Sequence, residues 1–220
     1  LGEYSALVAS GALRFSEAVA LVQKRGQYMT DAAPQGIGKM VAVMNAEREV
    51  IEKACQEASA FGIVAPANYN TPQQIVIGGE VAAVDQAMTL LKEAGVKRMI
   101  PLNVSGPFHT ALLQPASKKL AQDLAKLNFQ TMQIPVISNT TAEIMPQEAI
   151  QALLEKQVMS AVRFEDSIET MKAMNVGTMI EVGPGKTLTG FVKKIDKTIE
   201  MHRVEDVATL TETLTALTGR

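Results

Sequence analysis

The sequence has 220 residues, of which 47% are hydrophobic and 20% are charged, and its formal net charge is −2. This composition is typical of a globular protein with a sizeable core, and the dispersed Lys and Arg residues argue against nucleic acid as a partner, because phosphate binding needs clustered positive charge. No apolar run approaches the roughly 20 residues that cross a bilayer, and the single cysteine, Cys55, cannot form an internal disulfide. We therefore expect a cytoplasmic protein with no membrane and no nucleic-acid partner.

Two helices are predicted at the start of the chain. Apolar residues recur at helical spacing in residues 3–13, and a second stripe runs from Ala18 to Met29, with Ser16 as its expected N-cap. Arg25 falls inside this second stripe. A buried, unpaired guanidinium is costly, so Arg25 is held either in a structural ion pair, which the pattern alone favours, or against a ligand carboxylate or phosphate.

A different pattern follows the Pro- and Gly-containing break near residue 36. Short apolar runs alternate with amphipathic segments in the order βαββαβ, which is the ferredoxin-like pattern. The expected strands are 39–44, 63–68, 73–77 and 97–102, and the expected helices are 47–60 and 81–94. The pattern is complete within residues 36–104, so we expect a small domain inserted into a larger one.

The rest of the chain continues the alternation of strands and helices. We expect helices at 113–127, 147–156, 164–174, 187–195 and 207–217, and strands at 134–138, 178–182 and 200–204. Such alternation implies a parallel sheet covered on both faces and an α/β fold. The large domain would then combine residues 1–35 with residues 105–220.

His109 is the strongest candidate for chemistry. It follows Gly106, Pro107 and Phe108 in a loop just after a predicted strand, and an imidazole titrates near neutral pH and can take up and return a proton. Taken alone, a structural role for His109 is favoured. The other histidine, His202, lies within a predicted strand and is interpreted as structural.

Other candidate motifs are weaker. The turn Gly183–Lys186 lacks the spacing of a phosphate-binding loop, and Pro184 removes a backbone N–H, so a tight strand-to-helix turn is favoured over an anion site. No cluster has metal-ligand spacing. None of the serines that could partner a histidine stands in a Gly-x-Ser-x-Gly elbow; these serines are Ser5, Ser10, Ser16 and Ser105. The chain nevertheless opens with Leu1 and Gly2, followed by a predicted helix. If a serine preceded Leu1, these two residues would be the last two positions of a Gly-x-Ser-x-Gly elbow.

Four segments together resemble the malonyl-CoA:acyl carrier protein transacylase family of bacterial fatty acid synthesis. They are Leu1–Ala6, Gln23–Gly26, Gly106–Thr110 and Glu181–Lys186, and the similarity covers the whole chain in order. The resemblance implies an α/β-hydrolase-like large domain with a parallel sheet and an inserted ferredoxin-like domain. It also implies a catalytic serine immediately before Leu1 and further large-domain strands upstream of it.

The resemblance assigns roles to individual residues. His109 would be the general base, and the backbone carbonyl of Gln157 would orient it. Arg25 would bind the free carboxylate of the malonyl group, Phe108 would belong to the malonyl-selective form of the His109 loop, and the backbone N–H of Leu1 would be an oxyanion-hole donor.

The implied reaction is a ping-pong transfer of malonyl from malonyl-CoA through an acyl-serine to the phosphopantetheine thiol of acyl carrier protein, with no metal or cofactor and with a monomeric enzyme. Two alternatives stay open: the acyltransferase domain of a polyketide synthase, and a non-catalytic fragment or binding module without the nucleophile. Because carrier proteins are acidic, some exposed lysines are candidates for a docking rim, although ordinary solvated lysines explain them equally well. These are Lys118, Lys119, Lys186, Lys193 and Lys194.

Overall fold

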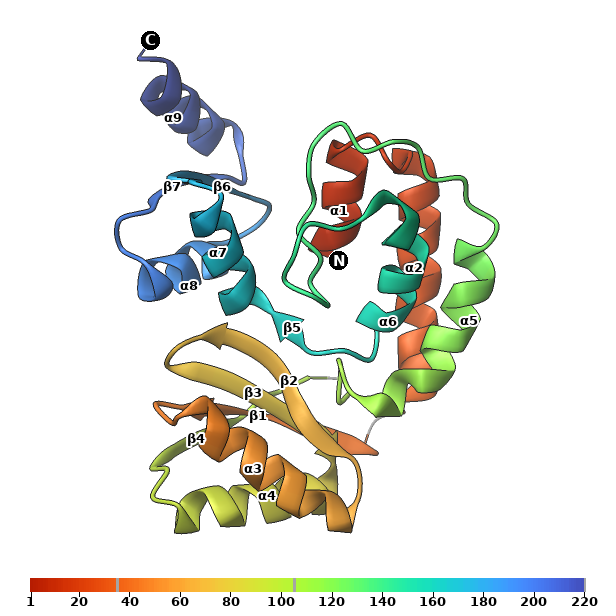
Figure 1. The fold of residues 1–220 in the computed structure, drawn as a ribbon, viewed down its shortest axis with the longest axis vertical. Helices are drawn as coiled ribbons and strands as arrows, with labels where there is room; N and C mark the ends of the chain where they lie inside the picture. The colour runs from red at the N-terminus through yellow and green to blue at the C-terminus, as the bar shows by residue number, and fades with distance from the viewer. Residues whose placement is uncertain (35, 105, 220) are drawn as a thin grey trace. The chain divides into compact units, whose positions relative to one another are not determined.

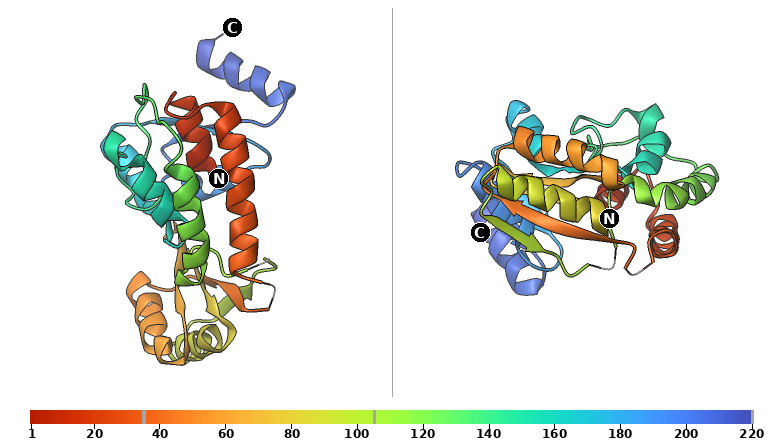
Figure 2. Two further views of the ribbon diagram at one scale, coloured as in Figure 1. Left: turned by 90° about the vertical axis from the view of Figure 1, so that its right-hand side faces the viewer. Right: turned by 90° about the horizontal axis from the view of Figure 1, so that it is seen from below.

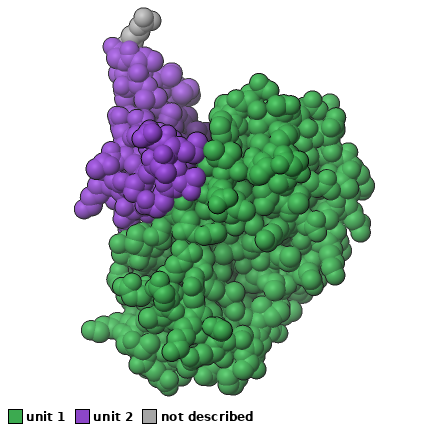
Figure 3. All heavy atoms as spheres, viewed as in Figure 1, with its two compact units in different colours: residues 1–167 green, residues 168–220 purple. Residues whose placement is uncertain are grey.

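The computed structural model describes residues 1–34, 36–104 and 106–219. The chain divides into two compact units, Leu1–Ser167 and Ile168–Arg220, which are coloured separately in Figure 3. The division falls within helix α7 (Phe164–Ala173). Each unit has its own secondary structure and is described by itself below.

The first unit contains a layer of packed helices. Helix α2 packs against α5, and α5 packs against α6 (Figures 1 and 2). A cluster of buried apolar side chains, among them Tyr4, Leu21, Leu120 and Leu154, fills the space between them. The helices of this layer are α1 (Gly2–Ala9), α2 (Phe15–Ala32), α5 (Gln114–Leu124) and α6 (Ile150–Gln157), with short 3₁₀ turns at Ala111–Leu113 and Gln147–Ala149.

The same unit contains a five-stranded mixed sheet in the order β4-β1-β3-β2-β5. Strand β1 pairs antiparallel with β3 and β4, β2 pairs antiparallel with β3, and β2 pairs parallel with β5. In chain order the elements are β1 (Gly38–Met44), α3 (Arg48–Ala58), a 3₁₀ turn (Ser59–Phe61), β2 (Val64–Thr71), β3 (Gln74–Glu80), α4 (Val81–Glu93), β4 (Arg98–Pro101) and β5 (Val162–Arg163). The predicted βαββαβ order of elements is thus present within residues 36–104.

The two faces of this sheet are buried by different partners. Helices α3 and α4 cover one face, where Ile51 and Leu91 pack on Val43 and Ile77 (Figure 2). The other face carries Met40, Ala42, Ala67 and Val76, and Phe108 and Leu102 pack against it. Alternate residues of β1 therefore point into two separate apolar clusters, as the period of two in a strand requires. The His109 loop is anchored on the second face through Phe108.

The second unit contains a parallel pair of strands, β6 and β7, with register Thr178 to Glu200 through Val182 to Val204. A helix connects the strands, as parallel pairing requires. The elements are β6 (Thr178–Val182), α8 (Thr187–Ile195), β7 (Glu200–Val204) and α9 (Val207–Thr218). Helix α9 begins with a capping box in which Asp206 accepts from the backbone N–H of Thr209, and it ends at Gly219 in the left-handed conformation.

Two expectations from the sequence are wrong. Residues 134–138 form no strand and contribute only an isolated bridge between Ile137 and Ile144; Pro135 lies in this segment, and a proline cannot donate to a strand ladder. Helix α2 begins at Phe15, with Arg14 rather than Ser16 as N-cap. The guanidinium of Arg14 pairs with Glu17 at 2.6 Å across the first turn, a pairing that the spacing of apolar residues does not report.

Within the described residues, no helix is long and apolar enough to cross a membrane. The same residues contain no group of three or more His, Cys, Asp or Glu side chains placed to hold a metal ion.

Candidate functional site

His109 follows strand β4 and has a φ of +59°, a left-handed conformation that is uncommon outside glycine. Its side chain is part-buried, and Nδ1 lies 3.3 Å from the backbone oxygen of Gln157 and 3.1 Å from that of Ser160. Carbonyl oxygens only accept hydrogen bonds, so Nδ1 carries the proton and donates to both of them. The lone pair on Nε2 is therefore available to act as a base.

Burial, followed by the positive charge of Arg25, lowers the pKa of His109 to about 4. The hydrogen bonds to Gln157 and Ser160 act in the opposite direction but are outweighed. His109 is consequently neutral at pH 7, with its tautomer fixed by the two carbonyls. A neutral imidazole with a free Nε2 can accept a proton from a neighbouring hydroxyl or thiol.

Gln157 is the residue through which the site is connected. It lies at the end of α6 with only 2% of its surface exposed. Its backbone oxygen contacts His109, its side-chain oxygen accepts a hydrogen bond from Nη2 of Arg25 at 3.2 Å, and its side-chain nitrogen donates to Glu3 in a short hydrogen bond. One buried residue thus joins α1, α2 and the His109 loop.

Arg25 lies on the buried face of α2 and is 9% exposed. Its recorded partners are the Gln157 amide and the ring of Tyr4, whose centroid is 5.7 Å from the guanidinium carbon. Neither partner carries a negative charge, and the buried Nε of Arg25 makes no hydrogen bond. A guanidinium in this condition has positive charge and donors left for an anionic ligand. Among the described residues, Arg25 therefore does not form the structural ion pair that the sequence pattern favoured.

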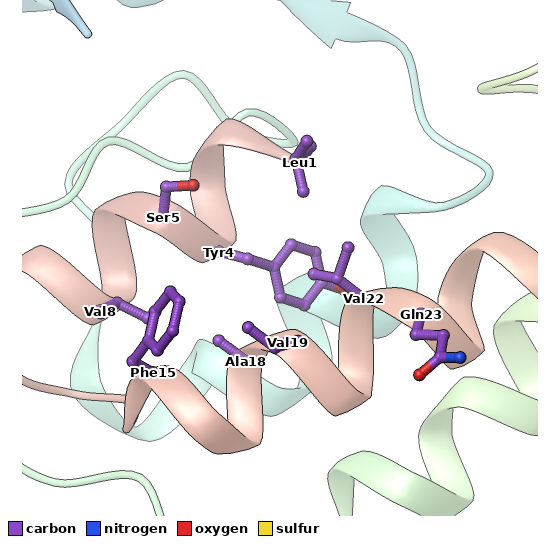
Figure 4. Close-up of a pocket in the computed structure, with 9 residues that line it drawn as sticks. All are labelled: Leu1, Tyr4, Ser5, Val8, Phe15, Ala18, Val19, Val22 and Gln23. Atoms are coloured by element: carbon purple, nitrogen blue, oxygen red, sulfur yellow. The ribbon is translucent and has the colours of Figure 1, made fainter. Parts of the chain in front are cut away.

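Leu1 and Phe108 flank this arrangement in different ways. Leu1 is the N-cap of α1 and is 70% exposed. Phe108 is part-buried and packs on both the helical cluster and the second face of the sheet. A pocket of about 480 Å³ opens between α1 and α2 (Figure 4). Leu1 and Tyr4 line it, whereas His109, Arg25 and Gln157 do not.

The structure brings His109, Arg25 and Gln157 together, although they are far apart in the sequence. It adds two residues that sequence reasoning missed, Ser160 and Glu3. Ser160 contributes only a backbone oxygen, which no side-chain pattern reports, and Glu3 resembles an ordinary acidic residue in the first turn of a helix. Ser105, a nucleophile candidate by residue type, lies outside the described residues.

Several backbone donors of the turn at Gly183–Lys186 and of the start of α8 are already bound by the second unit's own carboxylates. The carboxylate of Glu181 accepts from the backbone N–H groups of Leu188 and Thr189 at 3.0 and 2.8 Å, at the start of α8. Glu205 accepts from the N–H of Gly185 at 2.7 Å. The donors that would attract a phosphate are thus satisfied by carboxylates of the second unit itself, which supports the tight-turn interpretation.

Comparison with known proteins identifies the class. The family described as acyl transferase domain matches residues 1–216. The match spans nearly the whole chain, and the class of protein is accordingly an acyltransferase.

Individual relatives narrow this class. The malonyl CoA-acyl carrier protein transacylase of Bacillus subtilis is 45% identical over 212 residues, which are 96% of this chain and 67% of that protein. The crystal structure of MCAT from Streptococcus pneumoniae has a TM-score of 0.95 and 59% identity, covering 97% of this chain and 70% of that one. A malonyl-transacylase solved in complex with its type II PKS acyl-carrier protein has a TM-score of 0.92 and 41% identity, covering 99% and 70%. The chain belongs to the malonyl CoA-acyl carrier protein transacylase family.

Proposed function

We propose that the full-length protein containing this chain transfers the malonyl group from malonyl-CoA to the phosphopantetheine thiol of acyl carrier protein. The observation that carries the proposal is the convergence on Gln157 of a neutral, oriented His109 and of Arg25, for which the described residues supply no negatively charged partner. One group can move a proton, and the other can recognise a carboxylate. Family membership supports the same reaction.

His109 acts as the general base in this proposal. A serine immediately before Leu1 attacks the thioester carbonyl of malonyl-CoA while Nε2 of His109 takes the hydroxyl proton, and the coenzyme A thiol leaves with that proton. The phosphopantetheine thiol then attacks the acyl-serine, with His109 again mediating proton transfer, and the serine is regenerated. The carbonyls of Gln157 and Ser160 keep the imidazole in the required tautomer without adding negative charge.

Arg25 selects the acyl group. Its buried Nε and its remaining Nη hydrogens have the fork geometry that binds a carboxylate through two hydrogen bonds. A malonyl group carries such a carboxylate and an acetyl group does not, so Arg25 favours malonyl. Desolvation strengthens this pairing, since the side chain is only 9% exposed.

Leu1 and Phe108 complete the proposed site. The backbone N–H of Leu1, at the positive end of α1, stabilises the oxyanion that forms when the carbonyl is attacked. Phe108, held between two apolar clusters, fixes the backbone on which His109 adopts its left-handed conformation. Its bulk also limits the acyl space beside the imidazole.

The domain organisation is part of the proposal. The strand order β4-β1-β3-β2, with both helices on one face, supports a ferredoxin-like small domain at 36–104. Residues 1–35 and 105–220 would then belong to an α/β-hydrolase-like large domain, for which the parallel β6–β7 pair gives partial support. The expected cytoplasmic location and monomeric state stay predictions.

A second function is favoured by one comparison. A relative at 41% identity was solved with a type II PKS acyl-carrier protein, so a polyketide carrier is an alternative malonyl acceptor. Rates of transfer to a fatty acid carrier and to a polyketide carrier, measured side by side in the holo form, distinguish the two. A preference for the polyketide carrier would assign the protein to that process instead.

The experiment that tests the proposal uses the full-length protein and malonyl-CoA, with intact-mass detection of the acyl-enzyme and of malonyl carrier protein. We expect a malonyl adduct on the serine before Leu1 that disappears when holo carrier protein is added. Because the pKa of His109 is lowered to about 4, the acid limb of the rate of adduct formation should lie well below the ordinary histidine value. Absence of any adduct from pH 5 to 8 contradicts the proposal and favours a binding module.

A further inference from the structure

Glu3 is a buried acid to which the proposed reaction gives no role. It lies in the first turn of α1, two residues after Leu1, and only 8% of its surface is exposed. A carboxyl group is expensive to bury unless it has hydrogen-bond partners. Its position beside the site, rather than on the surface of the helix, therefore requires an explanation.

Glu3 accepts a short hydrogen bond at Oε2 from Nε2 of the Gln157 side chain, and hydrogen bonds from the Asn139 backbone and the Ser138 side chain also favour its ionised form. On its other side, the same amide accepts from Nη2 of Arg25 at 3.2 Å. An amide can be turned over, exchanging its oxygen and nitrogen, and only its hydrogen-bond partners decide which way it points. Glu3 accepts from the nitrogen and Arg25 donates to the oxygen, so both partners select the same orientation.

The charge state of Glu3 suits this arrangement. Burial raises the pKa of Glu3, and the hydrogen bonds from Gln157, Asn139 and Ser138 only partly oppose the effect. The group that contacts Arg25 directly is the uncharged Gln157 amide, and burial disfavours the ionised form of the Glu3 carboxyl on its other side. The Gln157 amide thus connects Glu3 to Arg25 through hydrogen bonds and places no negatively charged atom against the guanidinium.

We propose that Glu3 is a positioning residue for Arg25: it holds the Gln157 amide so that the amide oxygen fixes Nη2 and leaves Nε directed at the ligand carboxylate. This inference rests on the proposed function, because it gives Glu3 a part in choosing malonyl over acyl groups without a carboxylate. Glu3 itself does not touch the substrate.

Removing the acceptor at position 3 should act through Gln157. In the Glu3→Leu variant, which keeps a comparable volume, Nε2 of Gln157 has no acceptor and the amide loses one of the two partners that orient it. The kcat/KM ratio of malonyl-CoA to acetyl-CoA should fall about tenfold, the loss expected for one misplaced hydrogen bond to a charged group. The change should come from a higher KM for malonyl-CoA, with acetyl transfer nearly unchanged.

Three further variants make this test specific. Glu3→Gln retains a side-chain oxygen that accepts from Gln157, so it should restore the ratio to within about twofold of the wild type. Asp123→Ala removes a carboxyl with the same 8% exposure elsewhere in the helical layer, and it should lower the melting temperature without changing the ratio. Gln157→Leu should lower the ratio, and adding Glu3→Leu to it should cause no further loss, since both changes interrupt one path.

The outcomes separate the inference from the function on which it rests. If the wild type transfers malonyl and Arg25→Ala loses selectivity, but Glu3→Leu keeps the wild-type ratio, the positioning role is wrong and the function stands. An equal loss of malonyl and acetyl transfer in Glu3→Leu also overturns the positioning role, because it indicates general damage. If Glu3→Leu does not fold, Glu3→Gln and Gln157→Leu are compared instead. The inference is contradicted if the malonyl-to-acetyl ratio of kcat/KM falls as far in Glu3→Gln as in Gln157→Leu. It is supported if Glu3→Gln keeps the wild-type ratio. Wild-type protein that transfers no malonyl overturns both.

Discussion

Two neighbouring residues of α2, Lys24 and Arg25, belong to two polar clusters of opposite character. Lys24 belongs to the Asp123 cluster, in which Asp123 accepts hydrogen bonds from Lys24 at 2.8 Å, Tyr28 at 2.7 Å and Lys126 at 3.1 Å. The hydrogen bond from Lys24, followed by that from Tyr28, holds the pKa of Asp123 well below its usual range. Opposite charges meet in this cluster, and it ties α2 to α5.

Arg25 belongs to the Gln157 cluster, which comprises Glu3, Arg25, His109 and Gln157. Here the uncharged amide of Gln157 lies between Glu3 and Arg25. The pKa of Glu3 is raised, and that of His109 is lowered. Both shifts disfavour ionised groups next to a buried cation. The difference indicates that the first cluster contributes stability, whereas the second keeps a positive charge and a free imidazole nitrogen for a ligand.

The largest effect should come from His109→Ala set against Asp123→Ala. In the full-length protein, His109→Ala should slow formation of the malonyl adduct by about a thousandfold or more, since no other group takes the proton. Asp123→Ala should leave adduct formation within about threefold and should lower stability by about 1–3 kcal/mol, the usual cost of losing a buried charged hydrogen-bond partner. Rapid-quench intact-mass measurement and thermal unfolding report the two quantities.

The contrast between the two clusters is wrong if Asp123→Ala slows adduct formation and His109→Ala only lowers stability. A normal acylation burst in His109→Ala would remove the imidazole from the mechanism. His202→Ala, which changes the other histidine of the sequence, serves as the control and should transfer malonyl at the wild-type rate.

Arg25→Ala and Lys24→Ala, at adjacent positions of α2, form the next pair and have opposite expected outcomes. Arg25→Ala should reduce kcat/KM for malonyl-CoA by about tenfold to a hundredfold while acetyl-CoA is little affected, because a desolvated guanidinium–carboxylate pair is lost. Lys24→Ala should lower the melting temperature and leave the malonyl-to-acetyl ratio unchanged. Equal losses on both acyl groups in Arg25→Ala would contradict its assignment to the acyl carboxylate.

The elements that depend on local pattern could be predicted from the sequence. The βαββαβ segment has regular periodicity, and its strands and helices lie within a few residues of their expected bounds. Residues 134–138 show the limit of such reasoning: an apolar run there was predicted to be a strand, yet only one bridge forms, at Ile137. An apolar run indicates burial, whereas a strand also needs a partner along its length.

The candidate site depends on contacts between distant residues, and periodicity does not report these. His109 and Gln157 are 48 positions apart, and Glu3 and Gln157 are 154 apart. The first pair was expected only through family resemblance. Glu3 was not expected at all, because its burial is a property of the packed α1, α2 and α6 helices rather than of its own sequence neighbours.

The pH dependence of stability should distinguish the clusters by sign. The pKa of Asp123 is lowered on folding, so its contribution is present above the ordinary aspartate pKa and is lost as the pH falls through the folded value. The pKa of Glu3 is raised, so its burial is favourable below the ordinary glutamate pKa and becomes unfavourable as the pH rises through the folded value.

Two isosteric variants measure these slopes. Relative to the wild type, Asp123→Asn should lose stability as the pH rises from about 2 to 5, and Glu3→Gln should gain stability as the pH rises above about 4. Denaturant unfolding of the full-length protein at a series of pH values provides the data. Slopes of the same sign in both variants would show that the two acids share one kind of environment.

The smallest effect concerns the outer face of α5, which carries Lys118 and Lys119 one turn before Asp123. Both lysines are exposed; Nζ of Lys119 lies 4.0 Å from Asp31 and 5.7 Å from the centroid of the Tyr28 ring. If they belong to a docking rim for an acidic carrier protein, the double charge reversal Lys118→Glu with Lys119→Glu should raise the KM for carrier protein several-fold at low salt. The rate of adduct formation with malonyl-CoA should not change, because the first half-reaction needs no carrier. If the double variant shows unchanged kinetics with carrier protein at low ionic strength, Lys118 and Lys119 do not contribute to docking. The Gln157 cluster would then be the part of the helical layer with a functional role.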